Sequence, residues 1–174
     1  GVSPVLGDII EMTPSELADA AQGADVIVFT AGAAGSGLDR TTAIDGDGPG
    51  RAIEAARILG ITRFYLVSAF PEAGRLRERV DAFEHYMAQK KRADADVAAS
   101  DLDWVILRPG KLLDGPGGDT VSLGRAITYG DVDRETVARV LLALIEQPSV
   151  RREILELTDG RTPIQEAIGD LRQG

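Results

Sequence analysis

The stretch DVIVFTAGAAGSG, residues 25–37, sets the fold class. Asp25 to Thr30 is a continuous apolar, β-branched run, typical of a strand buried on both faces of a parallel sheet. Small residues follow from Ala31 to Gly37, and they let a ligand approach the backbone closely. The spacing G-x-x-G-x-G is neither a dinucleotide fingerprint nor a phosphate-binding P-loop, so this loop alone identifies no ligand.

Strand-like and helix-like segments alternate on both sides of this stretch. Strands are predicted over residues 2–6, 25–30, 63–68, 103–108 and 154–157. Helices are predicted over residues 14–22, 42–59, 78–98 and 134–146, and from 163 onward. Because strands alternate with helices throughout, we expect an α/β fold with a parallel sheet in one domain, residues 1–174.

Several short motifs mark where these helices begin and end. Thr13-Pro14-Ser15-Glu16 is a capping box, and Thr162 to Gln165 repeats its logic before the terminal helix. Asp133 is the expected N-cap of the helix that ends near Glu146. Gly60 is the expected stop of the helix before it.

Composition excludes several classes of function. The chain has 174 residues, with 19 Lys and Arg against 28 Asp and Glu, so its net charge is −9. Such a chain disfavours nucleic-acid and anionic membrane partners. It has no cysteine and one histidine, His85, which excludes cysteine-ligated and multi-histidine metal sites. With no membrane-length apolar run and no signal peptide, the expected location is the cytoplasm.

The Asp45-Gly46-Asp47-Gly48 segment looks at first like the start of a calcium-binding loop. An EF-hand needs an acidic residue eleven positions after its first ligand. Ala56 stands at that position, so we reject calcium there and predict no metal site. The expected role of the segment is a helix start packed against the sheet or a ligand.

Tyr86 and Lys90 are the strongest candidates for chemistry. Residues i and i+4 share one helix face, so their side chains lie near each other. A lysine ammonium beside a phenol favours the phenolate and lowers its pKa, which makes tyrosine a usable general acid or base. The alternative is an exposed helix with a tyrosine packed on a lysine stem. Lys91 suits a solvated face in either case, and His85 is expected outside the site.

Three motifs in this order resemble the short-chain dehydrogenase/reductase superfamily. They are Thr30-Ala31-Gly32 after a strand, Val67-Ser68 after the next, and Tyr86 to Lys90 followed by DLDWVILRPG, residues 101–110. The closest resemblance is to its atypical NAD(P)H-binding branch of epimerase-like and flavin-reductase-like proteins. It implies a Rossmann-like parallel sheet with helices on both faces, and it covers nearly the whole chain.

The resemblance also implies roles for individual residues. Tyr86, Lys90 and Ser68 would be catalytic, with Lys90 also holding the ribose hydroxyls near the nicotinamide. The implied cofactor-binding residues are Asp8, Ile9, Thr30, Ala31, Gly32, Asp45, Val67, Ser68, Lys90, Pro109, Gly110 and Lys111. Among these, Asp8 would lie near the adenine. Asp45 stands at the place of the usual active-site asparagine, which this branch often replaces with aspartate.

Two features depart from the family pattern. The family usually has two serines at the end of the strand predicted here over residues 63–68. In this chain Ser68 is followed by Ala69. The β-α-β opening with its glycine-rich turn is also not in these residues, so the fold is expected to be incomplete at its N-terminus. Residues 1–7 match the third strand of the family. A chain with only these residues is expected to bind dinucleotide poorly.

The sequence therefore leaves three functions open. The first is an NAD(P)H-dependent oxidoreductase or epimerase-like enzyme, with NADP preferred over NAD by resemblance, acting on a small carbonyl, quinone, flavin or sugar-like substrate. The second is a non-catalytic NAD(P)H-binding sensor, and the third is an interaction domain without a ligand. Residues 70–77 and 113–130 are the expected substrate rim, with residues 115–118 as a lid. The oligomeric state stays open.

Overall fold

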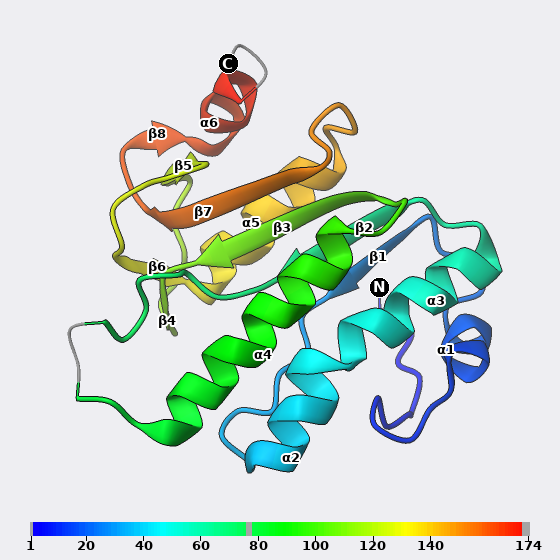
Figure 1. Cartoon of the computed structure of the whole chain (residues 1–174). Helices are drawn as coiled ribbons and strands as arrows, with labels where there is room; N and C mark the ends of the chain where they lie inside the picture. The colour runs from blue at the N-terminus through cyan, green and yellow to red at the C-terminus, as the bar shows by residue number, and fades with distance from the viewer. Residues whose placement is uncertain (1, 76–77, 172–174) are drawn as a thin grey trace. The chain divides into compact units, whose positions relative to one another are not determined.

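The computed structural model describes residues 2–75 and 78–171 (Figure 1). The chain divides into two compact units. One unit comprises Gly1–Leu66 and Arg79–Asp103, and the other comprises Val67–Glu78 and Trp104–Gly174. Each unit contains parallel strands and helices, which confirms the predicted α/β class. The prediction of one domain over residues 1–174 stays a prediction.

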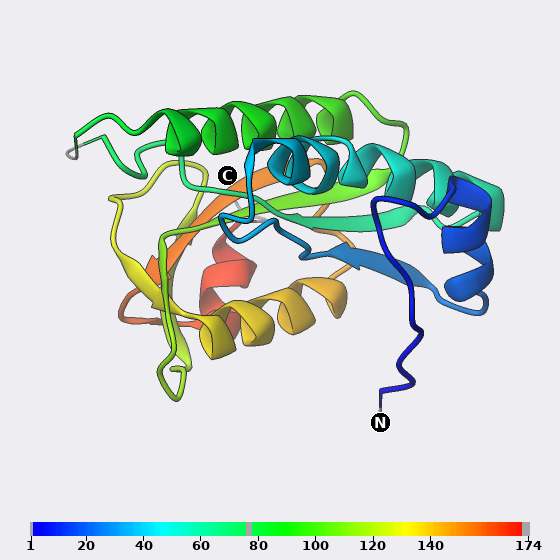
Figure 2. The same ribbon diagram turned by 90° about the horizontal axis from the view of Figure 1, so that it is seen from below.

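The first unit is built on a parallel strand pair. β1 (Val26–Phe29) pairs with β2 (Arg63–Val67) in a register that sets Val26 opposite Arg63. Its helices are α1 (Pro14–Ala20), α2 (Leu38–Thr41), the π-helix η1 (Thr42–Gly46), α3 (Gly48–Leu59) and α4 (Asp81–Ala98). Figure 2 shows α3 and α4 on the same side of this pair.

Local sequence explains the ends of these helices. The capping box before α1 forms as predicted, because the Thr13 hydroxyl accepts a hydrogen bond from the Glu16 N–H and the Glu16 carboxylate accepts one from the Thr13 N–H. Gly60 ends α3 with a φ of 69°, a left-handed conformation that glycine adopts without strain. The predicted single helix over residues 42–59 is instead α3 preceded by a π-turn, with Pro49 in the first turn of α3.

Two predictions about the first unit are wrong. Residues 2–6 form no strand, and Val2, Val5 and Leu6 are exposed, since no described strand supplies hydrogen bonds to this segment. β1 is also not buried on both faces, because among the described strands it pairs only with β2, and Val28 is 37% exposed. A β-branched run forms a strand there, but burial depends on neighbours that local sequence does not encode.

The second unit holds the strands β3 (Asp103–Pro109, apart from its first residue), β4 (Lys111–Leu113), β5 (Thr120–Gly124), β6 (Asp131–Asp133), β7 (Glu153–Asp159) and β8 (Thr162–Pro163). β3 pairs in parallel with β7, and β4 with β6, whereas β5 is antiparallel to both β7 and β8. The helices are α5 (Arg134–Ile145) and α6 (Ile164–Asp170).

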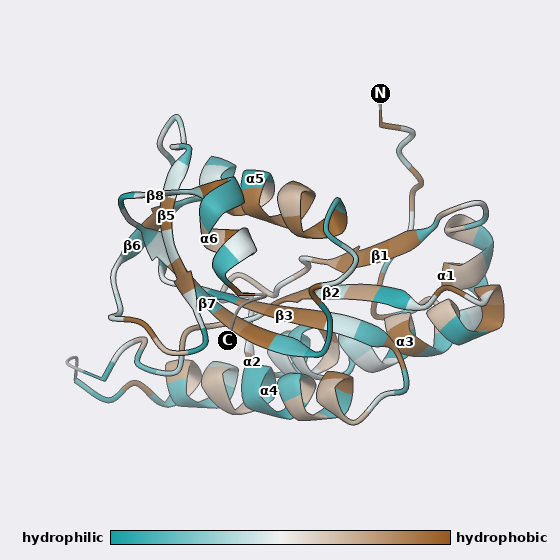
Figure 3. Ribbon diagram, turned by 90° about the horizontal axis from the view of Figure 1, so that it is seen from above, coloured by the Kyte–Doolittle hydropathy of each residue, from teal (hydrophilic) through white to brown (hydrophobic). Residues whose placement is uncertain are grey.

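The hydrophobic core of the second unit lies along β3, β7 and α5. Val105, Leu107 and Leu155 are essentially inaccessible, and α5 turns Val140 and Leu144 inward. Figure 3 shows hydrophobic colour along much of β3 and β7 and on part of α5. The wide apolar stripe of α5 is therefore explained by core packing.

Two predicted caps in the second unit behave differently from expectation. Asp133 is the N-cap residue of α5, but its carboxylate accepts a hydrogen bond from the Gly117 N–H instead of capping the helix. The capping box predicted over residues 162–165 is wrong, because Thr162 is paired in β8 and Pro163 becomes the N-cap of α6 without a side-chain hydrogen bond.

Candidate functional site

The candidate site in the first unit is organised around the buried carboxylate of Asp45. Asp45 lies in η1 and is 1% exposed. Its Oδ2 accepts a hydrogen bond of 3.0 Å from the Ala33 N–H, in the glycine-rich loop that follows β1. Its Oδ1 lies 3.2 Å from the Nζ of Lys90 on α4, which is also buried. One carboxylate therefore connects the glycine-rich loop to the lysine predicted as catalytic.

Small residues make this arrangement possible. A Cβ at Gly46 would overlap the side chains of Gln89 and Arg92, so α4 approaches η1 closely at this glycine. A Cβ at Gly32 would lie 3.3 Å from the Asp45 Oδ1, which is tighter than most such contacts. The AIDGDG segment therefore brings η1 close to α4 at Gly46. At Gly48 it also packs on the Phe29 ring of β1, in keeping with the prediction of a helix start packed against the sheet. π-turns of this kind are frequent at functional sites.

Tyr86 lies on the same face of α4 as Lys90, as predicted from their spacing. The Lys90 Nζ is 5.8 Å from the centre of the Tyr86 ring, and the ring of Phe83 packs 6.0 Å away. Burial, then the charges of Asp45 and Asp94, raise the pKa of Tyr86 to about 12. This is opposite to the predicted lowering. The predicted lowering holds for an isolated lysine cation, whereas in the structure Lys90 is paired with Asp45.

His85 holds α4 against the π-helix. Its Nε2 lies 2.8 Å from the Oγ1 of Thr42, and that hydroxyl is also 3.1 Å from the Leu38 carbonyl oxygen. This contact gives His85 a structural role at the residue before Tyr86.

The remaining predicted residues of the first unit lie in two turns. The Asp8 carboxylate accepts a hydrogen bond of 2.9 Å from the Ile10 N–H, and the Ile9 carbonyl accepts one from Arg51 on α3. Thr30, Ala31 and Gly32 follow β1 directly, where Thr30 and Gly32 are exposed. Past them, Gly35 and Gly37 have φ of 77° and 118°, and space is open around both.

The other predicted residues lie in the second unit, at the ends of strands. The Ser68 N–H donates to the Leu107 carbonyl at 2.8 Å, and the Lys111 N–H donates to the Gly130 carbonyl at 2.9 Å. A Cβ at Gly110 would overlap the Gly130 carbonyl oxygen, so this position requires glycine. Val67 and Pro109 end β2 and β3 next to these residues. The structure thus groups the predicted residues into two sets, one in each unit.

Ser68 differs from the other residues of its set in one respect. Its side chain is buried, and its Oγ has no hydrogen-bond partner among the described residues. An unsatisfied buried hydroxyl is costly and needs an explanation. A ligand group that hydrogen-bonds to this hydroxyl would supply one.

The segment predicted as a lid is held down within its unit. The Gly117 N–H donates to the Asp133 Oδ2 at 3.1 Å, and the Gly118 N–H donates to the Thr136 Oγ1 at 2.8 Å. These bonds fix the loop to the start of α5, so glycine content alone was a poor sign of mobility. Of the other predicted rim segment, residues 76 and 77 lie outside the described residues.

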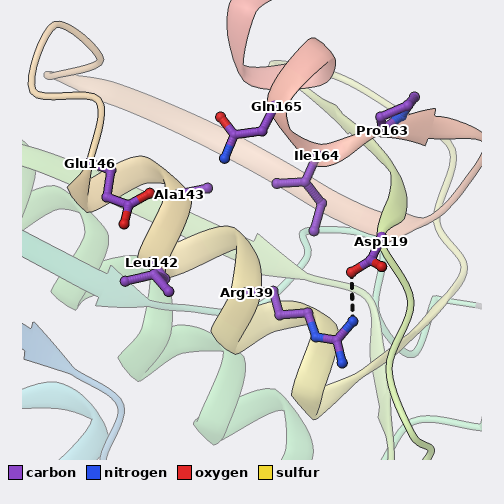
Figure 4. A pocket seen from close by; sticks show the side chains of 8 residues that line it. All are labelled: Asp119, Arg139, Leu142, Ala143, Glu146, Pro163, Ile164 and Gln165. Atoms are coloured by element: carbon purple, nitrogen blue, oxygen red, sulfur yellow. Dashed lines mark hydrogen bonds and ion pairs between the residues drawn. The ribbon is translucent and has the colours of Figure 1, made fainter.

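A groove that the sequence did not predict lies between α5 and α6 in the second unit (Figure 4). Its volume is about 360 Å³, and the Arg139–Asp119 ion pair lies at its edge. It contains none of the predicted site residues. The lining residues are Asp119, Arg139, Leu142, Ala143, Glu146, Pro163, Ile164 and Gln165.

Within residues 2–75 and 78–171, no three His, Cys, Asp or Glu side chains gather in a way that could hold a metal ion. Among the described helices, none combines the length and the apolar character that crossing a bilayer requires.

Comparison with known proteins identifies a family for this chain. Residues 1–148 match the NAD(P)H-binding family model. The uncharacterised sugar epimerase YhfK of Bacillus subtilis is 41% identical over 98% of this chain and 79% of its own length. The structure of the oxidoreductase YlbE of Lactococcus lactis shares the fold, with a TM-score of 0.85 at 24% identity over 98% of this chain and 77% of that one.

A second solved structure is that of ChuY of Escherichia coli O157:H7, described as an anaerobillin reductase. It has a TM-score of 0.72 at 28% identity and covers 88% of this chain and 73% of its own. The family match spans most of the chain, and the YhfK match spans nearly all of it. The chain therefore belongs to the NAD(P)H-binding family, with an epimerase-like relative in YhfK.

Proposed function

We propose that this chain is an NAD(P)H-dependent oxidoreductase or epimerase-like enzyme that acts on a small carbonyl, quinone, flavin or sugar-like substrate. Tyr86 is the proton donor, and Lys90 positions it and tunes its acidity. The observation that carries the proposal is the buried Asp45 carboxylate, which joins Lys90 to the loop after β1. Lys90 lies on α4, four residues after Tyr86. NADP is the preferred cofactor, the cytoplasm the expected location and a small molecule the expected partner.

The residues present fit a dinucleotide in three respects. The loop after β1 has small side chains and open glycines, so a phosphate or ribose can come close to the backbone. By the family resemblance the Lys90 ammonium would hold ribose hydroxyls, and it is fixed in position 3.2 Å from the Asp45 Oδ1. The unsatisfied Ser68 Oγ offers a hydroxyl to cofactor or substrate. When bound, NAD(P)H supplies the hydride for reduction of a carbonyl carbon.

Tyr86 is suited to give a proton rather than to take one. With a pKa raised to about 12, its phenol is protonated throughout the neutral range. The oxygen of a carbonyl under reduction becomes alkoxide-like, which is more basic than a phenolate, so the transfer is favourable. The Lys90 ammonium beside the ring then stabilises the phenolate that remains. By the family resemblance, Ser68 is also expected to be catalytic.

The second candidate function is a non-catalytic NAD(P)H-binding sensor. Ala69 favours the sensor, because by the family resemblance the catalytic serine tends to stand at this position. The high pKa of Tyr86 also favours it, since a phenol without a depressed pKa can be purely structural.

The test compares Tyr86→Phe with Tyr65→Phe. Both remove one phenol oxygen, but Tyr65 lies on β2 beside Arg63 and outside the proposed site. Oxidation of NADPH is followed with a panel of quinones, flavins, aldehydes and sugar ketones, and cofactor affinity is measured by fluorescence titration. If the chain is an enzyme, Tyr86→Phe should lower kcat about 100-fold or more and leave cofactor affinity unchanged. Tyr65→Phe should change neither kcat nor cofactor affinity. Cofactor binding without turnover, indifferent to Tyr86, would support the sensor instead.

Lys90→Met and Lys91→Met form a second matched pair. The two lysines are neighbours on α4, but Lys90 is buried against Asp45 and Lys91 is exposed. Loss of NADPH affinity in the first variant alone would support the proposed ribose contact. Equal affinity in both variants would exclude it.

A further inference from the structure

Phe70 and Tyr129 form an aromatic pair in the second unit. Phe70 is 1% exposed and comes two residues after Ser68. The ring of Tyr129 meets it edge to face, with 5.2 Å between the ring centres and 70° between the planes. Edge-to-face pairs are a preferred aromatic geometry. Phe70 therefore fixes the orientation of the Tyr129 ring from inside the unit.

Tyr129 also lies beside residues that are implied to contact the cofactor. Its neighbour Gly130 accepts the Lys111 N–H and fills the space that a side chain at Gly110 would need. Tyr129 itself is half-buried, and its hydroxyl makes no hydrogen bond to another described residue. A held aromatic ring with part of its surface free thus stands next to the segment that follows β3.

The second observation is independent of the aromatic pair. The Ser68 Oγ is buried and has no partner among the described residues, and the Ser68 N–H is bonded to Leu107, two residues before Pro109. An unpaired hydroxyl and an oriented ring therefore flank the same strand end. Together they suit a ligand that has both a flat π-surface and an oxygen acceptor.

We propose that Tyr129, held by Phe70, is a specificity-determining residue that packs on a planar conjugated ring, and that Ser68 donates to a carbonyl oxygen on that ring. The substrate class is then a quinone-like or flavin-like compound rather than an aliphatic or sugar-like carbonyl. This inference rests on the proposed function. For a quinone, the reaction balances as one quinone, one NAD(P)H and one proton giving one hydroquinone and one NAD(P)⁺.

The geometry explains why a ring would be preferred. A ring that is already oriented loses little conformational freedom when a ligand packs on it, so more of the contact energy appears as affinity. Stacking of one conjugated ring on one aromatic side chain changes affinity by roughly 5- to 150-fold. An aliphatic or sugar-like carbonyl has no π-face with which to make this contact.

The experiment uses a naphthoquinone, free riboflavin and an aliphatic aldehyde as probes. Binding of each is measured by equilibrium dialysis, and turnover with NADPH is measured separately. The variants are Tyr129→Leu, Tyr129→Met, which keeps bulk without a ring, and Tyr129→Phe, which keeps the ring. The control is Leu142→Ala, an exposed apolar residue on α5. Thermal unfolding identifies the variants that fold. The preference of the wild-type chain for planar probes over the aldehyde is a test that needs no variant.

We expect wild type to bind at least one planar probe at least tenfold more tightly than the aldehyde. Tyr129→Leu and Tyr129→Met should weaken planar binding about tenfold, or about 1.4 kcal/mol. Tyr129→Phe and the control should change it less than threefold, and aldehyde binding should not change. Equal binding of planar and aliphatic probes, or planar binding indifferent to loss of the ring, would overturn the proposal. Planar binding without turnover would instead refute only the enzymatic function.

Discussion

Neutralising Asp45 should destabilise the first unit far more than neutralising Asp47, two residues away. Asp45 is 1% exposed, its Oδ1 lies 3.2 Å from the Lys90 Nζ, and its Oδ2 accepts the Ala33 N–H. At an effective dielectric constant of about 20, that charge separation corresponds to about 5 kcal/mol of attraction. Desolvation offsets part of it, but removing one partner of a buried pair typically costs about 3–5 kcal/mol.

The lower end of that range applies to Asp45→Asn. Asparagine still offers an oxygen to the Ala33 N–H, and Lys90 has further interactions that remain. We therefore expect a loss of about 3 kcal/mol in the free energy of unfolding. For a domain of this size that lowers Tm by roughly 6–12 °C. Asp47 pairs with Arg92 at the surface, where both side chains are nearly half exposed, so Asp47→Asn should cost at most about 1 kcal/mol.

The assay is urea unfolding of both variants, followed by far-UV circular dichroism, which reports on α3 and α4 of the first unit. A spectroscopic titration of phenolate absorbance supplies a second readout. Because the Asp45 charge helps to raise the pKa of Tyr86, Asp45→Asn should lower it from about 12, while burial keeps it above the ordinary 10.0. If Asp45→Asn and Asp47→Asn are equally stable and the Tyr86 titration does not move, the central role of this carboxylate is refuted.

Three further predictions concern single positions. The pKa of Tyr86 is raised from 10.0 to about 12, so the folded state holds this proton more tightly than the unfolded chain does. That stability is complete below pH 10 and is lost as pH rises through 12, so wild type should lose up to about 3 kcal/mol relative to Tyr86→Phe across this range in urea titrations. Gly110→Ala would force a methyl group against the Gly130 carbonyl and should cost about 1–3 kcal/mol by the same assay, whereas no loss would contradict the close approach. Thr13→Ala removes the capping box with Glu16 and should cost about 1 kcal/mol, which chemical denaturation can resolve.

The parts of the fold that the sequence predicted correctly are those with strong local signals. The run before Thr30 forms β1, the run over residues 103–108 forms β3, and the capping box at Thr13 forms as expected. The segment Val2 to Leu6 carries a similar apolar signal but no strand, because pairing needs hydrogen bonds from a neighbour. Local patterns therefore predicted the conformation of a segment, extended or helical, better than they predicted which extended segments pair in a sheet.

The errors about the candidate site have the same origin. The spacing of Tyr86 and Lys90 placed both on one helix face, but the direction of the Tyr86 pKa depends on Asp45, which is distant in sequence. Glycines predicted a mobile lid at residues 115–118, yet Gly117 and Gly118 bond to groups 16 and 18 residues further along. Electrostatics and mobility arise from partners that only the folded chain brings together.

The multiple contacts of Asp45 decide how variants of the site must be interpreted. The same carboxylate fixes the glycine-rich loop through Ala33, pairs with Lys90 and raises the pKa of Tyr86. Loss of cofactor affinity in Asp45→Asn would therefore not by itself identify a cofactor contact, because the loop and Lys90 would change together. A double-mutant cycle of Asp45→Asn with Lys90→Met separates the two effects, since residues that act through one contact are not additive. If Lys90 is the only route from Asp45 to the cofactor, the double variant should bind NADPH no worse than Lys90→Met alone.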